Sequence, residues 1–102
     1  MKILYTENAI HDLQRLHDFL VSHNPHAAQE ISNRLRQAVN RLLDFPMLGG
    51  EVKNSDLIPS LRDLVTGKYI IRYMSLTSEI HILRIWHNKE ERNPMQANKL
   101  RS

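Results

Sequence analysis

The chain has 102 residues and a formal net charge of +3, so it has the size of one domain and can bury its own hydrophobic core. It contains no cysteine, which excludes disulfides and thiolate metal ligands and fits a cytoplasmic protein. No apolar run approaches the ~20 residues that a membrane span needs, and the first residues lack the apolar core of a signal peptide.

The basic charge is concentrated in the second part of the chain. Residues 1–59 hold six Lys and Arg against seven Asp and Glu, and residues 60–102 hold eight against four. The first part therefore carries −1 and the second +4. Such a basic region is typical of proteins that meet nucleic acid or an acidic partner. The alternative is a basic surface that serves solubility alone.

A short strand at residues 2–5 and an amphipathic helix open the predicted fold. Thr6 can cap this helix, because threonine is a preferred N-cap residue. The helix should end near Ser22 or His23. Apolar residues recur along it at helical spacing and form one stripe. They are Ala9, Leu13, Leu16 and Leu20.

A second amphipathic helix should follow almost at once. Asn24 is a preferred N-cap, and Pro25 suits the first helical position. Pro46 cannot continue a helix, so this helix should end at about Asp44. Its apolar stripe consists of Ala28, Ile31, Leu35, Ala38 and Leu42, widened by Val39 and Leu43. Two helices with so short a link form a hairpin, and their apolar stripes need a sheet to cover.

Residues 46–60 are a predicted loop, because they contain Pro, Gly-Gly and Asn-Ser. Three strands are expected after it, at Leu61–Val65, Tyr69–Met74 and Glu79–Trp86. The links between them are short, so the strands should form an antiparallel meander.

Each predicted strand of the meander carries an arginine among apolar residues. Strict alternation of side chains gives each strand an inner and an outer face. The residues expected against the helices are Ile71, Leu83 and Ile85. Those expected on the outer face are Arg62, Arg72, Arg84 and Trp86. The arginines then form either a binding face or cross-strand ion pairs, and a one-residue slip in register would reverse the assignment.

These elements and their motifs resemble the RelE/ParE family of toxins from type II toxin–antitoxin modules. The matching motifs are Asn24-Pro25-His26-Ala27-Ala28 with the helix that follows, Phe45-Pro46 and Gly49, Leu61–Val65, Gly67–Tyr73 and Ile82–His87. The resemblance implies an α+β fold of order β-α-α-β-β-β, an antiparallel sheet with a helical hairpin packed on one face. We expect one RelE/ParE-like domain over residues 1–92 and a polar C-terminal tail over residues 93–102.

The resemblance also implies a toxin that inhibits growth and is neutralised by a cognate antitoxin, without a cofactor. ParE-like members are associated with inhibition of DNA gyrase, whereas RelE-like members cut messenger RNA on the ribosome. The long helices joined at Asn24-Pro25 favour the ParE-like branch, and a ribosome-dependent mRNA endoribonuclease is the alternative. Whether the protein is an enzyme is left open. We expect the antitoxin to bind along a sheet edge or the helix hairpin.

The candidate site residues lie on the strands and directly after the last one. His87 can act as acid or base, a role for which the histidine side chain is suited in general, or it can end the strand structurally. Lys89 lies where RelE-like nucleases carry a basic residue, but Ile70 stands where they carry an arginine. The candidates for binding an anion or the target are Arg62, Arg72, Arg84 and Arg92. Their planar guanidinium groups match phosphate oxygens. No metal site is expected, because the histidines and nearby carboxylates form no ligand pattern.

Overall fold

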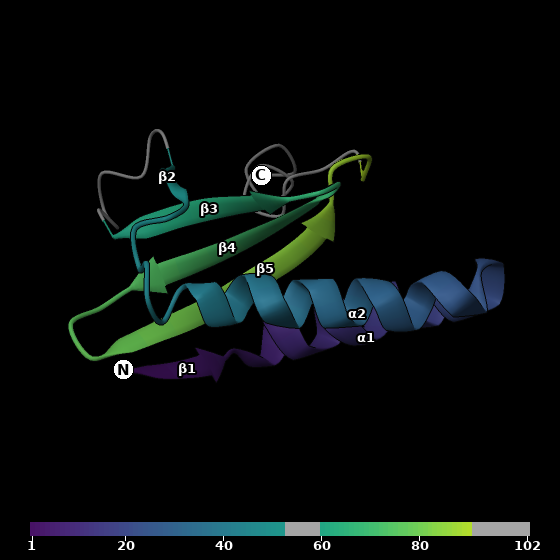
Figure 1. Cartoon of the computed structure of the whole chain (residues 1–102), viewed down its shortest axis with the longest axis horizontal. Helices are drawn as coiled ribbons and strands as arrows, with labels where there is room; N and C mark the ends of the chain where they lie inside the picture. The colour runs from purple at the N-terminus through teal and green to yellow at the C-terminus, as the bar shows by residue number, and fades with distance from the viewer. Residues whose placement is uncertain (53–59, 91–102) are drawn as a thin grey trace, which may run out of the picture.

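The computed structural model describes residues 1–52 and 60–90, and all structural statements below concern these residues. Two helices and five strands are present (Figure 1). In chain order they are β1 (Lys2–Tyr5), α1 (Glu7–His23), α2 (Pro25–Arg41), β2 (Gly50–Glu51), β3 (Leu61–Thr66), β4 (Tyr69–Ser75) and β5 (Glu79–His87). The predicted α+β fold and the order of its main elements are confirmed.

The sheet is mixed and not wholly antiparallel as predicted. Its strand order is β1-β5-β4-β3-β2, and β1 runs parallel to β5. The helical hairpin and the meander separate these two strands in sequence, and a long connection of this kind permits parallel pairing. The predicted loop also contains β2, whose Gly50 and Glu51 pair with Asp63 and Arg62 of β3.

Both helices begin where the sequence predicts. The Thr6 side chain accepts a hydrogen bond from the Ala9 N–H at 3.1 Å, and the Asn24 side chain accepts one from the Ala27 N–H at 3.2 Å. The second helix ends at Arg41, three residues before the predicted end. The N–H groups of the next residues bond to carbonyls three positions back, so the chain leaves the helix through tight turns.

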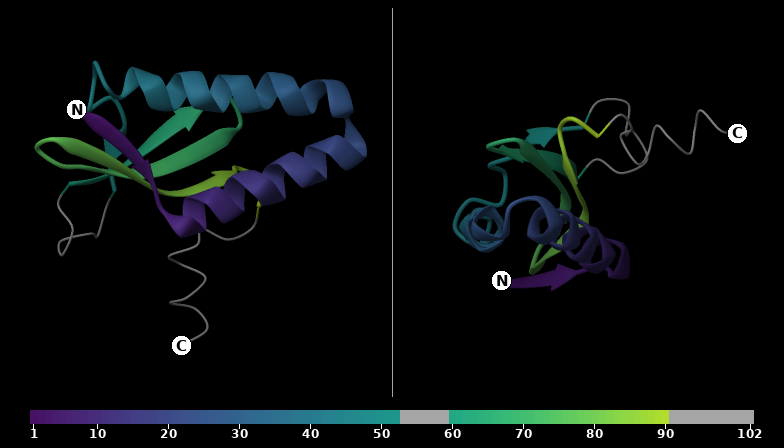
Figure 2. Two further views of the ribbon diagram at one scale, coloured as in Figure 1. Left: turned by 90° about the horizontal axis from the view of Figure 1, so that it is seen from below. Right: turned by 90° about the vertical axis from the view of Figure 1, so that its right-hand side faces the viewer.

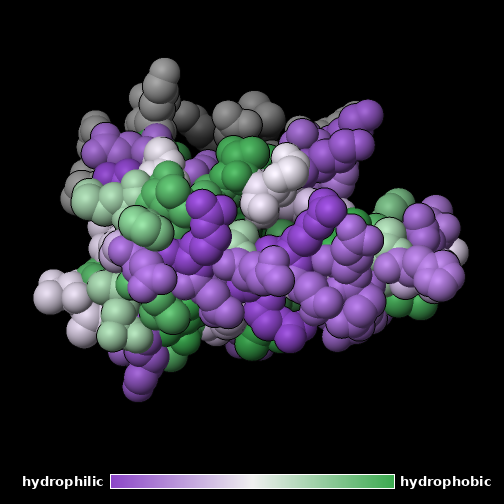
Figure 3. All heavy atoms as spheres, viewed as in Figure 1, coloured by the Kyte–Doolittle hydropathy of each residue, from purple (hydrophilic) through white to green (hydrophobic). Residues whose placement is uncertain are grey.

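The helices lie on one face of the sheet, meet at Asn24 and diverge toward the end where β1 lies (Figure 2). Their surface in the view of Figure 3 is mostly hydrophilic, as expected for amphipathic helices. The core between helices and sheet includes Ala9, Leu16, Leu35, Ala38, Val39, Leu42, Ile71, Tyr73, Ile80, Ile82 and Ile85. The predicted helix stripes are therefore confirmed, except that Leu43 is exposed.

The pairing of β5 with β4 shifts by one residue at Leu83. Arg72 faces Arg84, whereas the next β4 residue, Tyr73, faces Ile82, so Leu83 is an extra residue on β5. This is a β-bulge, which reverses the alternation of side chains beyond it. The fully buried β5 residues are Ile80, Ile82 and Ile85. The prediction that Leu83 faces the helices and Ile82 faces out is wrong, because it assumed an unbroken strand.

Candidate functional site

The three strand arginines do not form a common outer face, and that prediction is wrong. Arg62 faces Tyr73 across β3 and β4 and so lies on the side of the helices. Its guanidinium donates to the Gly49 carbonyl at 2.6 Å and lies 3.7 Å from Glu51. Arg84 turns to Asp12 of α1, with hydrogen bonds of 2.8 and 3.0 Å. By register Arg84 lies opposite Arg72, as predicted, but its guanidinium is held by this helix residue and does not stand free beside Arg72.

Arg72 lies on the sheet face away from the helices, directly opposite Arg84 in the register of β4 and β5. It is buried, and its guanidinium makes two hydrogen bonds to Asp63, at 2.8 and 2.9 Å. The guanidinium carbon lies 5.3 Å from the centre of the Trp86 ring, which is cation–π distance. Arg62, Arg72 and Arg84 are thus each held by a different partner, and their part in binding a target stays a prediction. Arg92 lies outside the described residues.

A buried carboxylate that sequence reasoning missed organises α1 against β5. Asp12 is 3% exposed and accepts hydrogen bonds from Arg84, from the Ile85 N–H at 2.8 Å and from Arg15 at 3.2 Å. The hydrogen bonding of Arg84 to Asp12 is the main reason that the pKa of Arg84 is raised. A buried charge requires such partners. The sequence carried a signal, because Asp12 lies three residues after Ala9 and falls on the apolar stripe.

Side chains of Thr6 and α1 take the place of a second neighbouring strand along the edge of β5 that does not pair with β4. The β1 strand pairs only as far as Ile82. Beyond it, the Thr6 hydroxyl donates to the Leu83 carbonyl at 3.0 Å, and Arg15 donates to the Ile85 carbonyl at 3.3 Å. Together with Asp12, they satisfy the open edge of β5 and fix the end of the strand that carries His87.

His87 and Lys89 lie together at this end. The Lys89 N–H donates to His87 Nδ1 at 3.0 Å, which leaves Nε2 as the ring nitrogen available to another group. The His87 N–H donates to Glu90 at 3.0 Å, and Glu90 forms an ion pair with Arg15 at 3.2 Å. The Tyr69 ring meets the His87 ring edge-on, with centres 5.0 Å apart.

A groove, here called the hairpin groove, lies between this end of the sheet and the two helices. It consists of two hollows of about 530 and 600 Å³ that share Leu20, Tyr69 and His87 in their lining. Its apolar lining includes Leu16, Phe19, Leu20, Ile31, Leu35, Ala38 and Tyr69. Its charged lining consists of Arg15, Arg34, Arg41, Lys68, Lys89 and Glu90. The structure therefore places His87 and Lys89 in an apolar groove with a basic rim.

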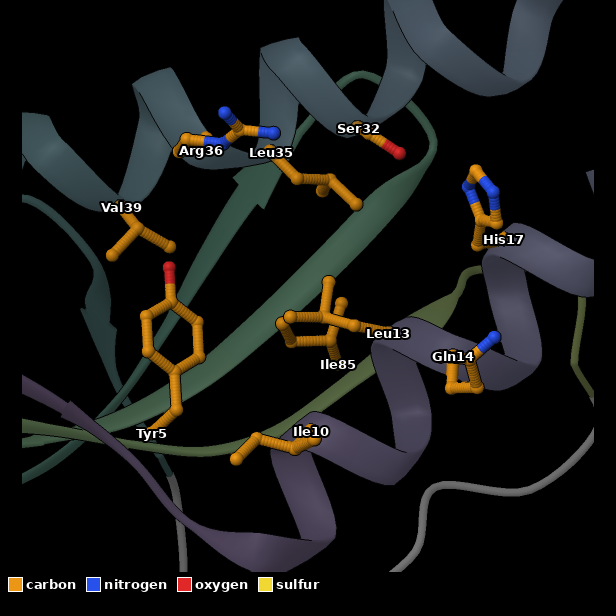
Figure 4. A pocket seen from close by; sticks show the side chains of 10 residues that line it. All are labelled: Tyr5, Ile10, Leu13, Gln14, His17, Ser32, Leu35, Arg36, Val39 and Ile85. Atoms are coloured by element: carbon orange, nitrogen blue, oxygen red, sulfur yellow. The ribbon is translucent and has the colours of Figure 1, made fainter.

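A second hollow, the interhelical cleft, opens where α1 and α2 diverge (Figure 4). Its volume is about 300 Å³, and its apolar lining comprises Ile10, Leu13, Leu35, Val39 and Ile85. The hydroxyl of Tyr5 points toward α2 in this cleft. Burial raises the pKa of Tyr5, and the charge of Arg36 opposes that shift in part. Arg36 is the one formally charged residue in the lining.

Within the described parts of the chain, no group of three or more His, Cys, Asp or Glu residues could hold a metal ion. In the same residues, no helix is long and apolar enough to cross a membrane.

Residues 3–92 match the family model described as the ParE toxin of the type II toxin–antitoxin system parDE. This chain belongs to the ParE toxin family. Toxin RelE1 of Caulobacter vibrioides is 33% identical over 94 residues, which cover 88% of this chain and 96% of the relative. Toxin RelE2 of the same organism is 32% identical over 87 residues, which cover 84% of this chain and 93% of that relative.

A solved structure described as the chromosomal ParDE TA system from P. aeruginosa has the same fold. Its TM-score is 0.68 at 23% identity, with 85% of this chain and 95% of that chain covered. The predicted membership of the RelE/ParE family is confirmed, and the chain is the toxin component of a toxin–antitoxin system. An antitoxin is therefore its partner.

The site of this ParE-family toxin combines residues that were predicted with residues that were not. His87 and Lys89 were predicted, and they do lie side by side. Arg15 and Glu90, which connect α1 to the backbone of His87, were not among the predicted site residues. Their sequence signal is weak, because they are charged residues on exposed positions and meet only through a contact between elements far apart in the chain.

Proposed function

We propose that this ParE-family toxin arrests growth by binding a macromolecular target, with DNA gyrase as the candidate, and not by cutting RNA. We expect it to act in the cytoplasm, where that target lies, and to be neutralised by its antitoxin. The supporting observation is that, within residues 1–52 and 60–90, the strand arginines that could hold a scissile phosphate are tied to other partners and do not line the groove that holds His87.

RNA cleavage needs a base for the ribose 2′-OH, a cation for the phosphate charge and an acid for the leaving oxygen. His87 is present, but one of its ring nitrogens already accepts the Lys89 N–H. Arg72 and Arg84 are each held by two hydrogen bonds to a carboxylate. Such pairs neutralise the charge that a scissile phosphate would need. Binding to a protein target requires no such constellation.

The RelE-like endoribonuclease remains the second candidate. The observation that favours it is the proximity of His87 and Lys89, which lie in one groove with Arg15. In that reading, His87 Nε2 would transfer the proton and Lys89 would stabilise the phosphate charge.

The two candidates separate on a double variant, His87→Ala with Lys89→Ala, expressed under induction. We expect the variant still to arrest growth, and cellular mRNA to stay intact with both wild type and variant. The matched control is Lys2→Ala with His26→Ala, which removes an exposed lysine and an exposed histidine that do not line the groove. The proposal fails if the wild type cuts transcripts in translating cells without changing DNA supercoiling, and if the double variant neither arrests growth nor cuts transcripts while the control variant does both.

A further inference from the structure

The link between α2 and β2 displays apolar side chains to water. It lies at the end of the sheet where β4 finishes, whereas β5 finishes at the opposite end (Figure 1). Residues 43–48 of this link are here called the apolar turn. Its exposed apolar residues are Leu43 (40% exposed), Phe45 (60%), Met47 (68%) and Leu48 (40%). Such a cluster in so short a segment marks a site of interaction, because water disfavours exposed apolar surface.

The backbone of the apolar turn is fixed by two side chains of the sheet. The Tyr73 hydroxyl accepts a hydrogen bond from the Gly49 N–H at 2.9 Å and donates one to the Pro46 carbonyl at 2.8 Å. Tyr73 itself is fully buried. Arg62 donates to the Gly49 carbonyl at 2.6 Å. The turn therefore presents its apolar side chains from a fixed backbone, and a surface fixed in this way loses little conformational entropy on binding.

The composition of the turn favours a protein partner over nucleic acid. Aromatic residues and methionine are enriched in protein interfaces. Nucleic-acid binding depends on cations that neutralise phosphates, whereas the single charged residue among residues 43–48 is Asp44. The nearby Arg62 is bonded to Gly49, and its side chain is 12% exposed.

The area of the turn disfavours a second copy of this chain as the partner. At about 200 Å² for a large side chain, the four apolar residues expose on the order of 400 Å². A stable dimer buries about 800 Å² on each partner. The turn is therefore too small to hold two copies together, but it has the size of a hot spot at the centre of a larger interface.

We propose that the apolar turn is a surface by which this toxin contacts its protein target, and that the target offers an apolar pocket to it. This inference rests on the proposed function, since it takes growth arrest to require binding to a protein. Phe45 and Met47, the most exposed of the four, enter the pocket, and Leu43 and Leu48 exclude water around them. The surfaces expected for the antitoxin are a sheet edge and the helix hairpin, and the turn belongs to neither.

The first test compares two double variants under induced expression. Phe45→Gln with Met47→Gln is the turn variant, and it should keep the Tm of wild type because both side chains are exposed. The matched control is Ile10→Gln with Val65→Gln, which changes apolar residues that are 54% and 67% exposed and lie outside the turn. We expect the turn variant to lose growth arrest and the control to arrest growth like wild type.

The second test uses purified proteins. The turn variant should need at least about tenfold more toxin than wild type to inhibit supercoiling by DNA gyrase, and the control should change this amount less than about twofold. The affinity for the protein encoded by the adjacent reading frame should stay within about twofold of wild type for both variants, which also shows that both are folded.

Three results would overturn the inference. They are growth arrest by the turn variant equal to that of wild type, a loss of at least about tenfold in its affinity for the antitoxin, or a dimeric wild type with a monomeric turn variant. The second result assigns the turn to the antitoxin, and the third assigns it to a second copy. Failure of the proposed function looks different, because wild type then arrests growth without inhibiting gyrase. In that case, growth of cells that express the turn variant still decides whether the turn contacts the target.

Discussion

Asp12 and Arg84 join α1 to β5 through two parallel hydrogen bonds, of 2.8 and 3.0 Å. The carboxylate is almost fully buried, whereas the side chain of Arg84 is 32% exposed. Asp12 also accepts the Ile85 N–H, so one side chain fixes both the side chain and the backbone of β5. The strand end that carries His87 is thus held to a helix along one edge, while its other edge pairs with β4.

Replacing Asp12 should therefore destabilise the fold. In Asp12→Ala, Arg84 loses its counter-charge and the Ile85 N–H loses its acceptor. We expect the free energy of unfolding to fall by about 2–3 kcal/mol, less than for a fully buried pair because Arg84 is partly exposed. Chemical denaturation measures the change. The control Asp18→Ala, at an exposed position of the same helix, should cost less than about 0.5 kcal/mol. Equal losses in the two variants would contradict the role given to Asp12.

Gly49 is expected to tolerate no side chain. A Cβ there would lie 2.7 Å from the Asp63 carbonyl oxygen and 2.8 Å from Tyr73 Cε1. The Gly49 N–H also donates to the Tyr73 hydroxyl, which in turn donates to the Pro46 carbonyl, so the loop cannot move away without losing hydrogen bonds. Gly49→Ala should lower the free energy of unfolding by about 1–3 kcal/mol.

The neighbouring glycine provides the control for that prediction. A Cβ at Gly50 would meet nothing within 4 Å. Thermal unfolding of Gly49→Ala and Gly50→Ala should therefore give a clearly lower Tm for the first variant only. A similar Tm for both would show that the loop does not pack against Tyr73 as closely as described.

Stability should fall in alkaline solution because of buried tyrosines. Burial is the main cause that raises the pKa of Tyr5, Tyr69 and Tyr73 above the ordinary value of 10.0. In each case the folded state retains the proton more strongly than the unfolded state. The contribution of these tyrosines to the free energy of unfolding is complete below pH 10. It is lost as the pH rises from there through their pKa values in the folded state.

Tyr5→Phe is the variant that tests this pH dependence. The Tyr5 hydroxyl makes no hydrogen bond within the described residues, so its removal should change stability little at neutral pH. The decline of the unfolding free energy above pH 10 should be shallower than in wild type. Denaturant titrations at several pH values measure the slope, and an unchanged slope would contradict the prediction.

Sequence reasoning succeeded where the determining interactions are local. Thr6 and Asn24 cap helices through side-chain bonds to residues three positions later, and such signals can be read from the chain. It failed where the determining contact is distant. The partner of Arg84 is a helix residue 72 positions away, and β1 pairs with the last strand. Neither pairing leaves a local pattern.

The face of β5 was wrongly assigned for a related reason. Alternation is a rule for unbroken strands, and the sequence Ile80-His81-Ile82-Leu83-Arg84-Ile85 satisfies two registers about equally well. The bulge at Leu83 lets isoleucines on both sides of it face the core. The carbonyl of the bulged residue, Leu83, accepts a hydrogen bond from Thr6, which lies 77 positions away, and so distant a contact leaves no pattern at the bulge itself.

The bulge itself can be tested with two adjacent substitutions. Ile82 is fully buried in the core, so Ile82→Ala should cost about 2–4 kcal/mol of unfolding free energy by leaving a cavity. Leu83 is half-buried and lies outside the core cluster, so Leu83→Ala should cost less than about 1.5 kcal/mol. An unbroken strand predicts the opposite order, because it turns Leu83 inward and Ile82 to solvent. Chemical denaturation of the two variants thus decides between the registers, and a larger loss for Leu83→Ala would exclude the bulge.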